Sequence, residues 1–307
     1  LVPPTTLFRS VRLSGSGSGR GAVLFVQHGG GEAILRVTVP GALRALIVST
    51  GEGRAEAAGL DGDVMLASGA GELVADRISG SLTARSGGGD IILGGIDGSV
   101  RCSTAGGDIR ARRIGGEAVL DTGGGDVSVE EVGRVARAST LGGAVRIRRA
   151  GASVIANTGG GLIEIGEAAG MVELRNAAGP VHVGAARGVR CETGSGAIRL
   201  SNVSGSLRAS TAMGSIVARL LAGEAGPGDS FLTTGNGDIT VFIPSNLGVK
   251  IRAENGLSGG MRRIVSDFPG VFPRVQGAHV VAEADINGGG PLLRISGTGG
   301  TIFIKRH

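Results

Sequence analysis

An 18-residue repeat with a fixed glycine is the feature that most limits what this chain can fold into. Ten consecutive blocks run from Ala45 to Gly223, and each is 18 residues long except for one block of 17 at Met171. Blocks that start at Asp229, near Gly248 and at Leu292 continue the pattern more weakly. The ninth position is glycine throughout, at Gly53, Gly71, Gly89, Gly107, Gly125, Gly143, Gly161, Gly179, Gly196, Gly214, Gly237, Gly256 and Gly300. A period of this length predicts a stack of equivalent structural units.

Alternation of apolar and polar residues places two strands in each block. Positions two and four are apolar, as at Val100 and Cys102, and so are positions eleven, thirteen and sixteen, as at Ile109. This alternation is typical of strands with one inward face, and the Gly-rich positions seven to nine mark a corner. No segment is long enough to form a crossover helix. The sequence therefore predicts an all-β fold, a right-handed parallel β-helix (β-solenoid) with about 18 residues per coil and capped ends.

Composition excludes the other classes of glycine-rich protein. The chain has 61 Gly among 307 residues but only 9 Pro, and its glycines do not fall at every third position, so it is not collagen-like. Its 41% hydrophobic content and net charge of +5 are the reverse of what keeps a segment disordered. No apolar run approaches the roughly 18 residues of a membrane span, so no transmembrane segment is expected.

The blocks divide the chain into four expected parts. Residues 1–22 form an extended N-terminal segment, and residues 23–44 form N-terminal cap strands that include residues 34–39. Ten regular β-helix coils occupy residues 45–223, and residues 224–307 form irregular C-terminal coils and a cap. All seven Phe lie outside the ten coils, which indicates that bulky side chains close the ends, where strand edges need cover.

Stacking of equivalent positions predicts columns of like side chains about 4.8 Å apart. The sixth position is polar in the regular blocks, as at Thr122, and we expect these side chains to hydrogen-bond at the corner. The tenth position carries Asp90, Asp108 and Asp126 in three successive blocks. The negative charges of three stacked carboxylates repel one another. A calcium ion, Arg side chains, backbone N–H groups and solvent exposure are the alternatives that would offset this repulsion. The sequence does not decide among them, and no metal ligand is assigned.

No residue is predicted to be catalytic, to bind a cofactor or to bind a metal, and we expect the protein not to be an enzyme. Cys102 and Cys191 fall at the inward fourth position of blocks five coils apart, about 24 Å along the axis. That distance is too long for a disulfide, so we expect both cysteines to be free and to pack in the interior as small hydrophobic side chains. A glycan-processing enzyme would need paired carboxylates in a groove, which the sequence does not locate. The histidines have no partner at metal-ligand spacing: His28, His182, His279 and His307.

The basic excess is almost entirely arginine, because lysine occurs only at Lys250 and Lys305. Nucleic acid is not an expected partner, since Trp and Tyr are absent and the arginines alternate with acidic residues. Anionic lipid surfaces and glycans are partners to which this charge could be attracted.

Four coil motifs and the C-terminal tail carry a family resemblance. The motifs are Ser86-Gly-Gly-Gly-Asp-Ile-Ile-Leu93, Thr104-Ala-Gly-Gly-Asp-Ile-Arg-Ala111, Thr122-Gly-Gly-Gly-Asp-Val-Ser-Val129 and Thr234-Gly-Asn-Gly-Asp-Ile-Thr-Val241. The tail runs from Gly237 to Pro244, through Val249 to Ala253, and closes with Ser296-Gly-Thr-Gly-Gly-Thr-Ile-Phe-Ile-Lys-Arg306. Over residues 23–306 the chain resembles a bacterial family of adhesin-like domains of unknown function. The resemblance implies a right-handed β-helix that is exported or envelope-associated, and it supplies no catalytic residues. Bactofilins, cytoskeletal β-helices that polymerise through their ends, are a more distant likeness.

Three functional hypotheses follow. The first is a non-enzymatic structural or adhesin-like β-solenoid of the bacterial cell surface or envelope, which presents a surface or assembles with copies of itself. The second is a filament subunit in which residues 1–22 add a strand to the end of a neighbour, so that a homo-oligomer or filament is expected. The third is a calcium-dependent surface-binding module that uses Asp90, Asp108 and Asp126. The chain begins at Leu1 and not at Met, which fits a processed N-terminus.

Overall fold

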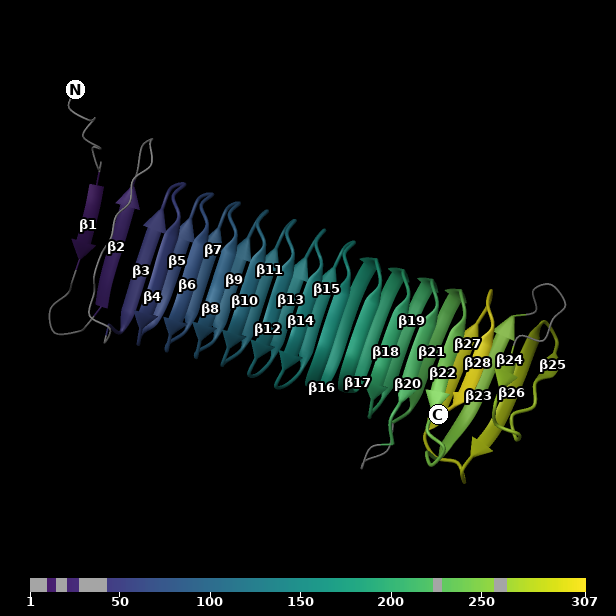
Figure 1. Ribbon diagram of the computed structural model, residues 1–307. Coiled ribbons are helices and arrows are strands. Elements are labelled where there is room, and N and C mark those ends of the chain that lie inside the picture. The colour runs from purple at the N-terminus through teal and green to yellow at the C-terminus, as the bar shows by residue number, and fades with distance from the viewer. Residues whose placement is uncertain (1–9, 15–20, 28–42, 223–227, 257–263) are drawn as a thin grey trace. The chain divides into compact units, whose positions relative to one another are not determined.

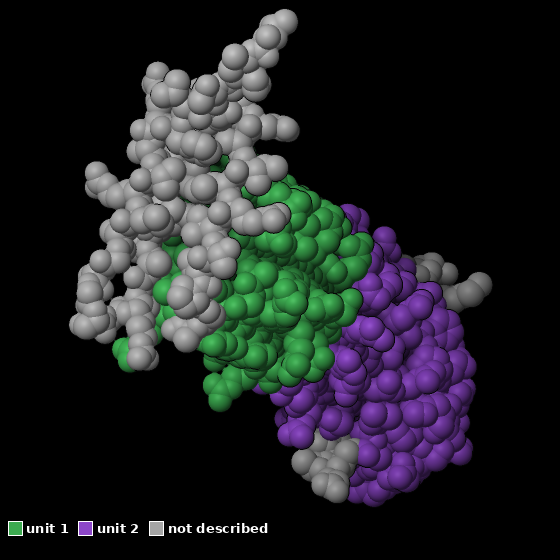
Figure 2. Space-filling view, turned by 60° about the vertical axis from the view of Figure 1, so that its left-hand side comes forward, with its two compact units in different colours: residues 1–147 green, residues 148–307 purple. Residues whose placement is uncertain are grey.

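The chain forms a parallel β-solenoid. The computed structural model describes residues 10–14, 21–27, 43–222, 228–256 and 264–307, and these residues contain strands and no helix. The chain divides into two compact units, unit 1 (Leu1–Ile147) and unit 2 (Arg148–His307), which Figure 2 distinguishes by colour. In each unit parallel strands stack in coils about 18 residues apart (Figure 1), consistent with a right-handed β-helix. The predicted fold class is confirmed.

Unit 1 contains two series of short strands, one for each half of the repeat. The first half supplies β3 (Ala45–Thr50), β5 (Asp63–Ser68), β7 (Leu82–Ser86), β9 (Val100–Thr104), β11 (Ala118–Thr122) and β13 (Ala136–Thr140). The second half supplies β4 (Ala55–Leu60), β6 (Leu73–Ile78), β8 (Ile91–Ile96), β10 (Ile109–Ile114) and β12 (Val127–Val132). Strands within a series pair in parallel and 18 residues apart, as Ile91 pairs with Ile109. The boundary between the units falls within β14 (Val145–Ala150).

Apolar side chains at the inward positions fill the interior of unit 1. Leu66, Ile91 and Ile109 are completely buried, whereas the outward neighbour Arg110 is exposed. The same alternation of buried and outward residues recurs along β5 to β12. The assignment of two half-buried strands to each block is therefore confirmed.

The ninth-position glycine is required because stacked corners approach each other closely. A Cβ atom on Gly107 would lie 2.3 Å from the carbonyl oxygen of Gly89, and one on Gly125 would lie 2.1 Å from that of Gly107. These are backbone contacts that a neighbouring side chain cannot relieve by moving. In unit 2, Gly196 and Gly214 also have φ angles of 151° and 148°, a region that side chains rarely adopt. Close approach therefore requires glycine in both units, and backbone conformation adds to the requirement in unit 2.

From Ser68 onward, the sixth-position side chains are buried, and they form hydrogen bonds with the backbone of the glycine corner. Thr122 Oγ1 donates to the carbonyl oxygen of Gly107 at 2.8 Å and accepts the N–H of Gly125 at 3.2 Å. Each hydroxyl thus joins the backbones of two successive corners, which confirms the predicted hydrogen bonds and identifies their partners. The same two bonds recur at Ser86, Thr104 and Thr140.

Two N-terminal strands extend the sheet at β3. β2 (Gly21–Gln27) pairs in parallel with β3, and β1 (Ser10–Ser14) pairs antiparallel with β2. The sequence places residues 10–14 in an extended segment, but the structure pairs them within their own chain, where they cover the open edge of β2. The second expected cap strand, residues 34–39, lies outside the described residues. The filament hypothesis, which gives residues 1–22 a partner in another subunit, stays a prediction.

Unit 2 contains two long strands that run through a corner. These two are β16 (Ile163–Ala178) and β17 (Val181–Ser195), and their register shifts between Ala168 and Met171, where the 17-residue block begins. The others are β15 (Val154–Thr158), β18 (Ile198–Val203), β19 (Leu207–Met213), β20 (Ile216–Leu220), β21 (Ser230–Asn236), β22 (Ile239–Ile243), β23 (Val249–Gly256), β24 (Ile264–Ser266), β25 (Arg274–Gln276), β26 (His279–Ile286), β27 (Leu292–Gly297) and β28 (Ile302–Arg306).

The last coils of unit 2 stack out of sequence order. β21 pairs in parallel with β27, and β22 pairs with β28, so the C-terminal strands form the coil next to β21 and β22. β23 pairs with the other edge of β27 and antiparallel with β26, which also pairs with β25. The chain therefore passes over one coil position, forms β23 to β26, and returns to fill that position with β27 and β28.

This order corrects one glycine assignment. Lys250 pairs with Leu292, so Gly256 comes level with Thr298, and a Cβ atom on Gly256 would lie 3.0 Å from the Thr298 carbonyl oxygen. The assignment of Gly256 to the ninth position is wrong by two residues. Asn255 instead occupies the sixth position, and its Nδ2 donates to the carbonyl oxygen of Gly300 at 2.7 Å, as the threonines do elsewhere.

Replacing Thr122 with valine is expected to destabilise the protein. Valine keeps the shape of the side chain but leaves the Gly107 carbonyl and the Gly125 N–H without their partner, at a cost of about 1–3 kcal/mol. Equilibrium urea unfolding, followed by circular dichroism, should give a lower midpoint for Thr122→Val. Thr122→Ser keeps the hydroxyl and should stay close to the wild type. Equal midpoints for all three proteins would contradict the role given to this column.

Candidate functional site

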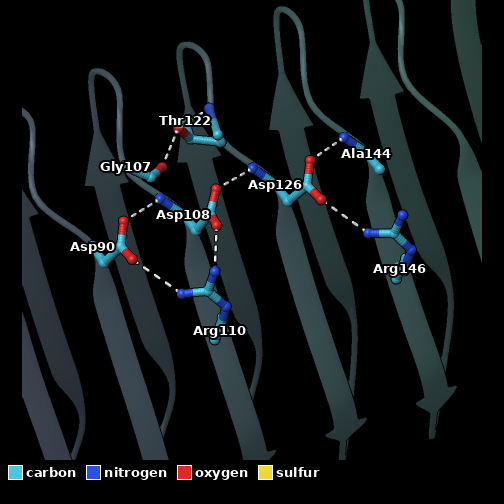
Figure 3. A network of polar contacts seen from close by, with 9 residues as sticks. Asp90, Gly107, Asp108, Arg110, Thr122, Asp126, Ala144 and Arg146 are labelled. Atoms are coloured by element: carbon cyan, nitrogen blue, oxygen red, sulfur yellow. Dashed lines mark hydrogen bonds and ion pairs between the residues drawn. The ribbon is translucent and has the colours of Figure 1, made fainter.

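The aspartate column that the sequence predicts is formed in unit 1. Asp90, Asp108 and Asp126 stand directly before β8, β10 and β12. Figure 3 shows the three carboxylates on successive coils, with Arg110 and Arg146 beside them. The column stacks three carboxylates of like charge, so its contacts decide what it can bind.

Each carboxylate in the column accepts a backbone N–H group from the next coil. Asp90 Oδ1 accepts the N–H of Asp108 at 2.8 Å, and Asp108 Oδ1 accepts the N–H of Asp126 at 2.7 Å. The series ends where Asp126 Oδ1 accepts the N–H of Ala144 at 2.8 Å. The carboxylate oxygen thus takes the place of a backbone carbonyl at the entry to each strand, and a charged acceptor strengthens the bond.

Arginine side chains contact the second oxygen of each carboxylate. Arg110 Nη1 lies 3.0 Å from Asp90 Oδ2, and its Nη2 contacts Asp108 Oδ2. Arg146 Nη1 lies 2.9 Å from Asp126 Oδ2. Of the alternatives that the sequence left open, backbone N–H groups and arginines both relieve the repulsion, and the side chains are also partly exposed.

The contacts of the column hold Asp126 in its ionised form. Its pKa is lowered from the ordinary value of 3.8, first because the carboxylate accepts the Ala144 N–H and further because Arg146 donates to it, while partial burial opposes the shift. Asp121, in β11, differs: burial raises its pKa, against the attraction of Arg101. Asp126 therefore acts as a charged acceptor at neutral pH.

The same bond from backbone to aspartate recurs at other strand entries. In unit 1, Asp63 Oδ1 accepts the N–H of Ser81 at 2.7 Å. In unit 2, Asp238 Oδ1 accepts the N–H of Thr301 at 2.8 Å, and Asp229 Oδ1 accepts that of Leu292 at 2.9 Å. An aspartate at the start of a strand thus joins two stacked coils. The aspartate column contains this same structural contact in three successive coils.

The described part of the chain contains no group of three or more His, Cys, Asp or Glu side chains that could hold a metal ion. In the aspartate column each carboxylate oxygen already faces a protein donor, which leaves fewer oxygen lone pairs for a cation such as Ca²⁺. The calcium-dependent hypothesis stays a prediction.

The cysteines and histidines of the described residues lie in different surroundings. Cys102 and Cys191 are free and buried, and burial is the main cause that raises the pKa of each thiol to about 12. Such a thiol is not a nucleophile at neutral pH, and the expectation of small buried hydrophobes is confirmed. His182 lies at an outward position of β17, and His307 meets the Phe242 ring edge-on. His28 lies outside the described residues.

Three of the described phenylalanines are placed differently from the expectation that they close the ends. Phe268 is buried, with 5% of its surface exposed. Phe231, Phe242 and Phe303 instead point outward from β21, β22 and β28 and are half-buried. The sequence contains a signal for this, because Phe231 occupies the third position of its block, which is outward in the regular coils.

Two of these rings lie beneath an arginine from the neighbouring coil. The Arg208 guanidinium lies 5.0 Å from the centroid of the Phe231 ring, and that of Arg219 lies 5.2 Å from the centroid of Phe242. A cation over an aromatic ring is worth about 0.5–1 kcal/mol at an exposed site. The contact orients the guanidinium and leaves the N–H donors at its edge available.

The net positive charge of the chain resides in unit 2. Residues 148–307 contain 16 Arg and Lys against 11 Asp and Glu, whereas residues 1–147 contain 15 of each kind. Long-range attraction for anions is therefore greater at unit 2 than at unit 1.

Comparison with known proteins gives no identity to this arrangement. No protein-family model matches the chain, and no curated protein or solved structure matches it significantly. The described residues include no helix that is long and apolar enough to span a membrane.

Calcium and chelator are expected to leave the melting temperature of the full chain unchanged. The reason is that backbone N–H groups and arginines already bind the oxygens of Asp90, Asp108 and Asp126. Scanning calorimetry in excess calcium and in EDTA checks this, with Asp108→Asn as the matched variant, which keeps an acceptor for the Asp126 N–H but removes the charge. A calcium-dependent rise in melting temperature that Asp108→Asn abolishes would contradict this expectation and favour the calcium-dependent alternative.

Proposed function

We propose that the protein is a non-enzymatic, adhesin-like β-solenoid of the bacterial cell surface or envelope, which presents its outward side chains to a partner. The observation that carries this proposal is that one set of polar side chains binds the backbone between coils, while another set faces outward. Side chains at corners and strand entries, such as Thr122 and Asp126, bind backbone groups between coils. The outward positions of the strands are exposed and differ from coil to coil, so the frame is constant while its surface varies.

The state of the cysteines and of the aspartate column in the described residues supports a binding role over catalysis. An active site needs a nucleophile, a base and an electrostatic stabiliser held together in a concave site. In the described residues the thiols are buried with raised pKa values, and the carboxylates of the aspartate column are bound by arginines and N–H groups. The thiols are buried and the carboxylates are bound between coils, so neither kind of group is available to a substrate.

The family resemblance supports the location. The Gly-Asp-Ile and Gly-Asp-Val motifs that resemble adhesin-like domains, including those at Asp90 and Asp126, are the motifs whose aspartates join the coils. What the resemblance implies, export or association with the envelope, is consistent with a protein whose variable surface is built for contact.

The proposal predicts that the protein is accessible from outside the cell. An antibody against the purified chain should label intact cells that express it, and the protein should be found in the envelope fraction or the medium. A cytoplasmic protein detected in parallel serves as the control for cell integrity. Labelling that appears only after the cells are opened, with the protein in the soluble internal fraction, would contradict the proposed location.

A further inference from the structure

We propose that an outward patch of unit 2, centred on Phe231, binds an acidic polysaccharide. Two adjacent columns form the patch. The arginine–phenylalanine column contains Arg208, Phe231 and Arg294, and the hydroxyl column contains Ser210, Thr233 and Ser296. This inference rests on the proposed function, because it names the class of ligand that the displayed surface takes.

Strand pairing places two cations around one aromatic ring. Arg208 in β19 pairs with Phe231 in β21, which pairs with Arg294 in β27. Neighbouring strands lie about 4.8 Å apart, so the two arginines stand about 10 Å apart on either side of Phe231. Arg294 reaches this position only because the C-terminal coil stacks beside β21, out of sequence order.

The hydroxyl column runs beside the arginine–phenylalanine column on the same face. Its residues lie two positions further along each strand, and residues two apart point to the same side of a sheet. Ser210 pairs with Thr233, and Thr233 pairs with Ser296. Within the described residues none of these three hydroxyls makes a hydrogen bond to the protein, so they are available to the hydroxyl groups of a ligand.

The arginines of the patch are less committed to protein partners than those of the aspartate column. In the described part of the chain, Arg208 contacts no carboxylate and lies over Phe231 at 5.0 Å. Arg294 lies 3.9 Å from Glu254, and both side chains are partly exposed. By contrast, Arg110 lies 3.0 Å from Asp90 and bridges to Asp108. A ligand carboxylate can therefore bind Arg208 without displacing an ion pair.

Further arginines extend the same row in both directions. Arg190 pairs with Arg208 across the strands, and Arg252 pairs with Arg294. The four arginines and Phe231 span about 19 Å at the usual strand spacing. The carboxylate partners of the outer two, Glu192 at 3.5 Å and Glu283 at 3.3 Å, form exposed pairs, which are worth little and can exchange for a ligand. A row of this length suits a linear polyanion.

The chemistry of the patch favours an acidic polysaccharide over a lipid surface. Guanidinium groups bind carboxylates in a two-pronged geometry, hydroxyls match the hydroxyls of sugars, and the Phe231 ring beneath Arg208 holds that guanidinium in place. A membrane surface would instead be met by protruding apolar side chains, whereas Phe231 is half-buried on its strand. The excess of positive charge in residues 148–307 also favours a negatively charged ligand.

Unit 1 contains a natural comparison for this patch. Arg101 and Arg137 flank Val119 at the same outward position, across β9, β11 and β13. The adjacent column there holds Asp121 between two serines, where unit 2 has Thr233. The unit 1 patch thus lacks the aromatic ring and places a carboxylate at its centre, which repels an acidic ligand.

Binding of the purified full chain to alginate, a linear polyuronate, tests the proposal. Calorimetric titration should show binding that weakens as salt is added, with no binding to neutral dextran. The double variant Arg208→Gln/Arg294→Gln should lower the affinity at least about tenfold, since each lost charge-assisted contact removes a strong hydrogen bond. Thr233→Asp, which installs the carboxylate of unit 1, should do the same. Arg101→Gln/Arg137→Gln is the matched control and should leave the affinity unchanged, and melting temperatures confirm that each variant folds.

Several results would overturn the assignment. Absence of alginate binding by the wild type, equal binding by Arg208→Gln/Arg294→Gln, or equal loss in Arg101→Gln/Arg137→Gln would each remove this patch as the site. Binding to vesicles of anionic phospholipid, but not to alginate, would assign the patch to a lipid surface instead. The cell-labelling experiment is independent: a surface protein that does not bind alginate loses only this ligand, whereas an internal protein that binds it loses the proposed function.

Discussion

Backbone contact between stacked glycine corners is the constraint on which the rest of the structure depends. The carbonyl oxygen of Gly107 occupies the place that a side chain on Gly125 would need, and the same contact recurs from coil to coil. At this spacing the corner brings carbonyl and N–H groups together, and Thr122 and its equivalents bind them. Aspartates at several strand entries bind a further backbone N–H group of the next coil, as Asp126 does for Ala144. The apolar interior follows from the alternation of the strands that these corners connect.

Most of this frame could be predicted from the sequence, because its causes repeat at fixed offsets. The period locates the corner glycines, and alternation locates the inward residues. For the aspartate column, the sequence named arginines and backbone N–H groups among four alternatives without deciding among them. The structure identifies the individual partners, such as Arg110, which lies 20 residues after Asp90 and reaches it through coil stacking. The coil order near the C-terminus was also hidden. The backbone N–H of Leu292 binds Asp229, which lies 63 residues earlier in the chain. The 18-residue repeat is weak in this region and gave no sign that Arg294 lies beside Phe231.

The two units show how one frame can support different surfaces. The patches around Val119 and Phe231 share two flanking arginines and two flanking serines, and they differ in the ring and in Asp121 against Thr233. Neither difference touches the interior or the corner. Function on such a frame is decided by a few outward residues, and a resemblance based on coil motifs therefore specifies the fold far better than the ligand.

The most direct test of the central claim compares two adjacent alanine substitutions in one corner. A Cβ atom on Gly125 would lie 2.1 Å from the Gly107 carbonyl oxygen, whereas one on Gly124 would meet only the Gly106 carbonyl oxygen, at 3.8 Å. Equilibrium urea unfolding should show a clearly lower midpoint for Gly125→Ala. Gly124→Ala should have the same midpoint as the wild type or a slightly higher one. Alanine lowers the conformational entropy of the unfolded chain, which stabilises the folded protein by about 0.4–1 kcal/mol. Equal midpoints for the two variants would contradict the claim that corner contact sets the spacing of the coils.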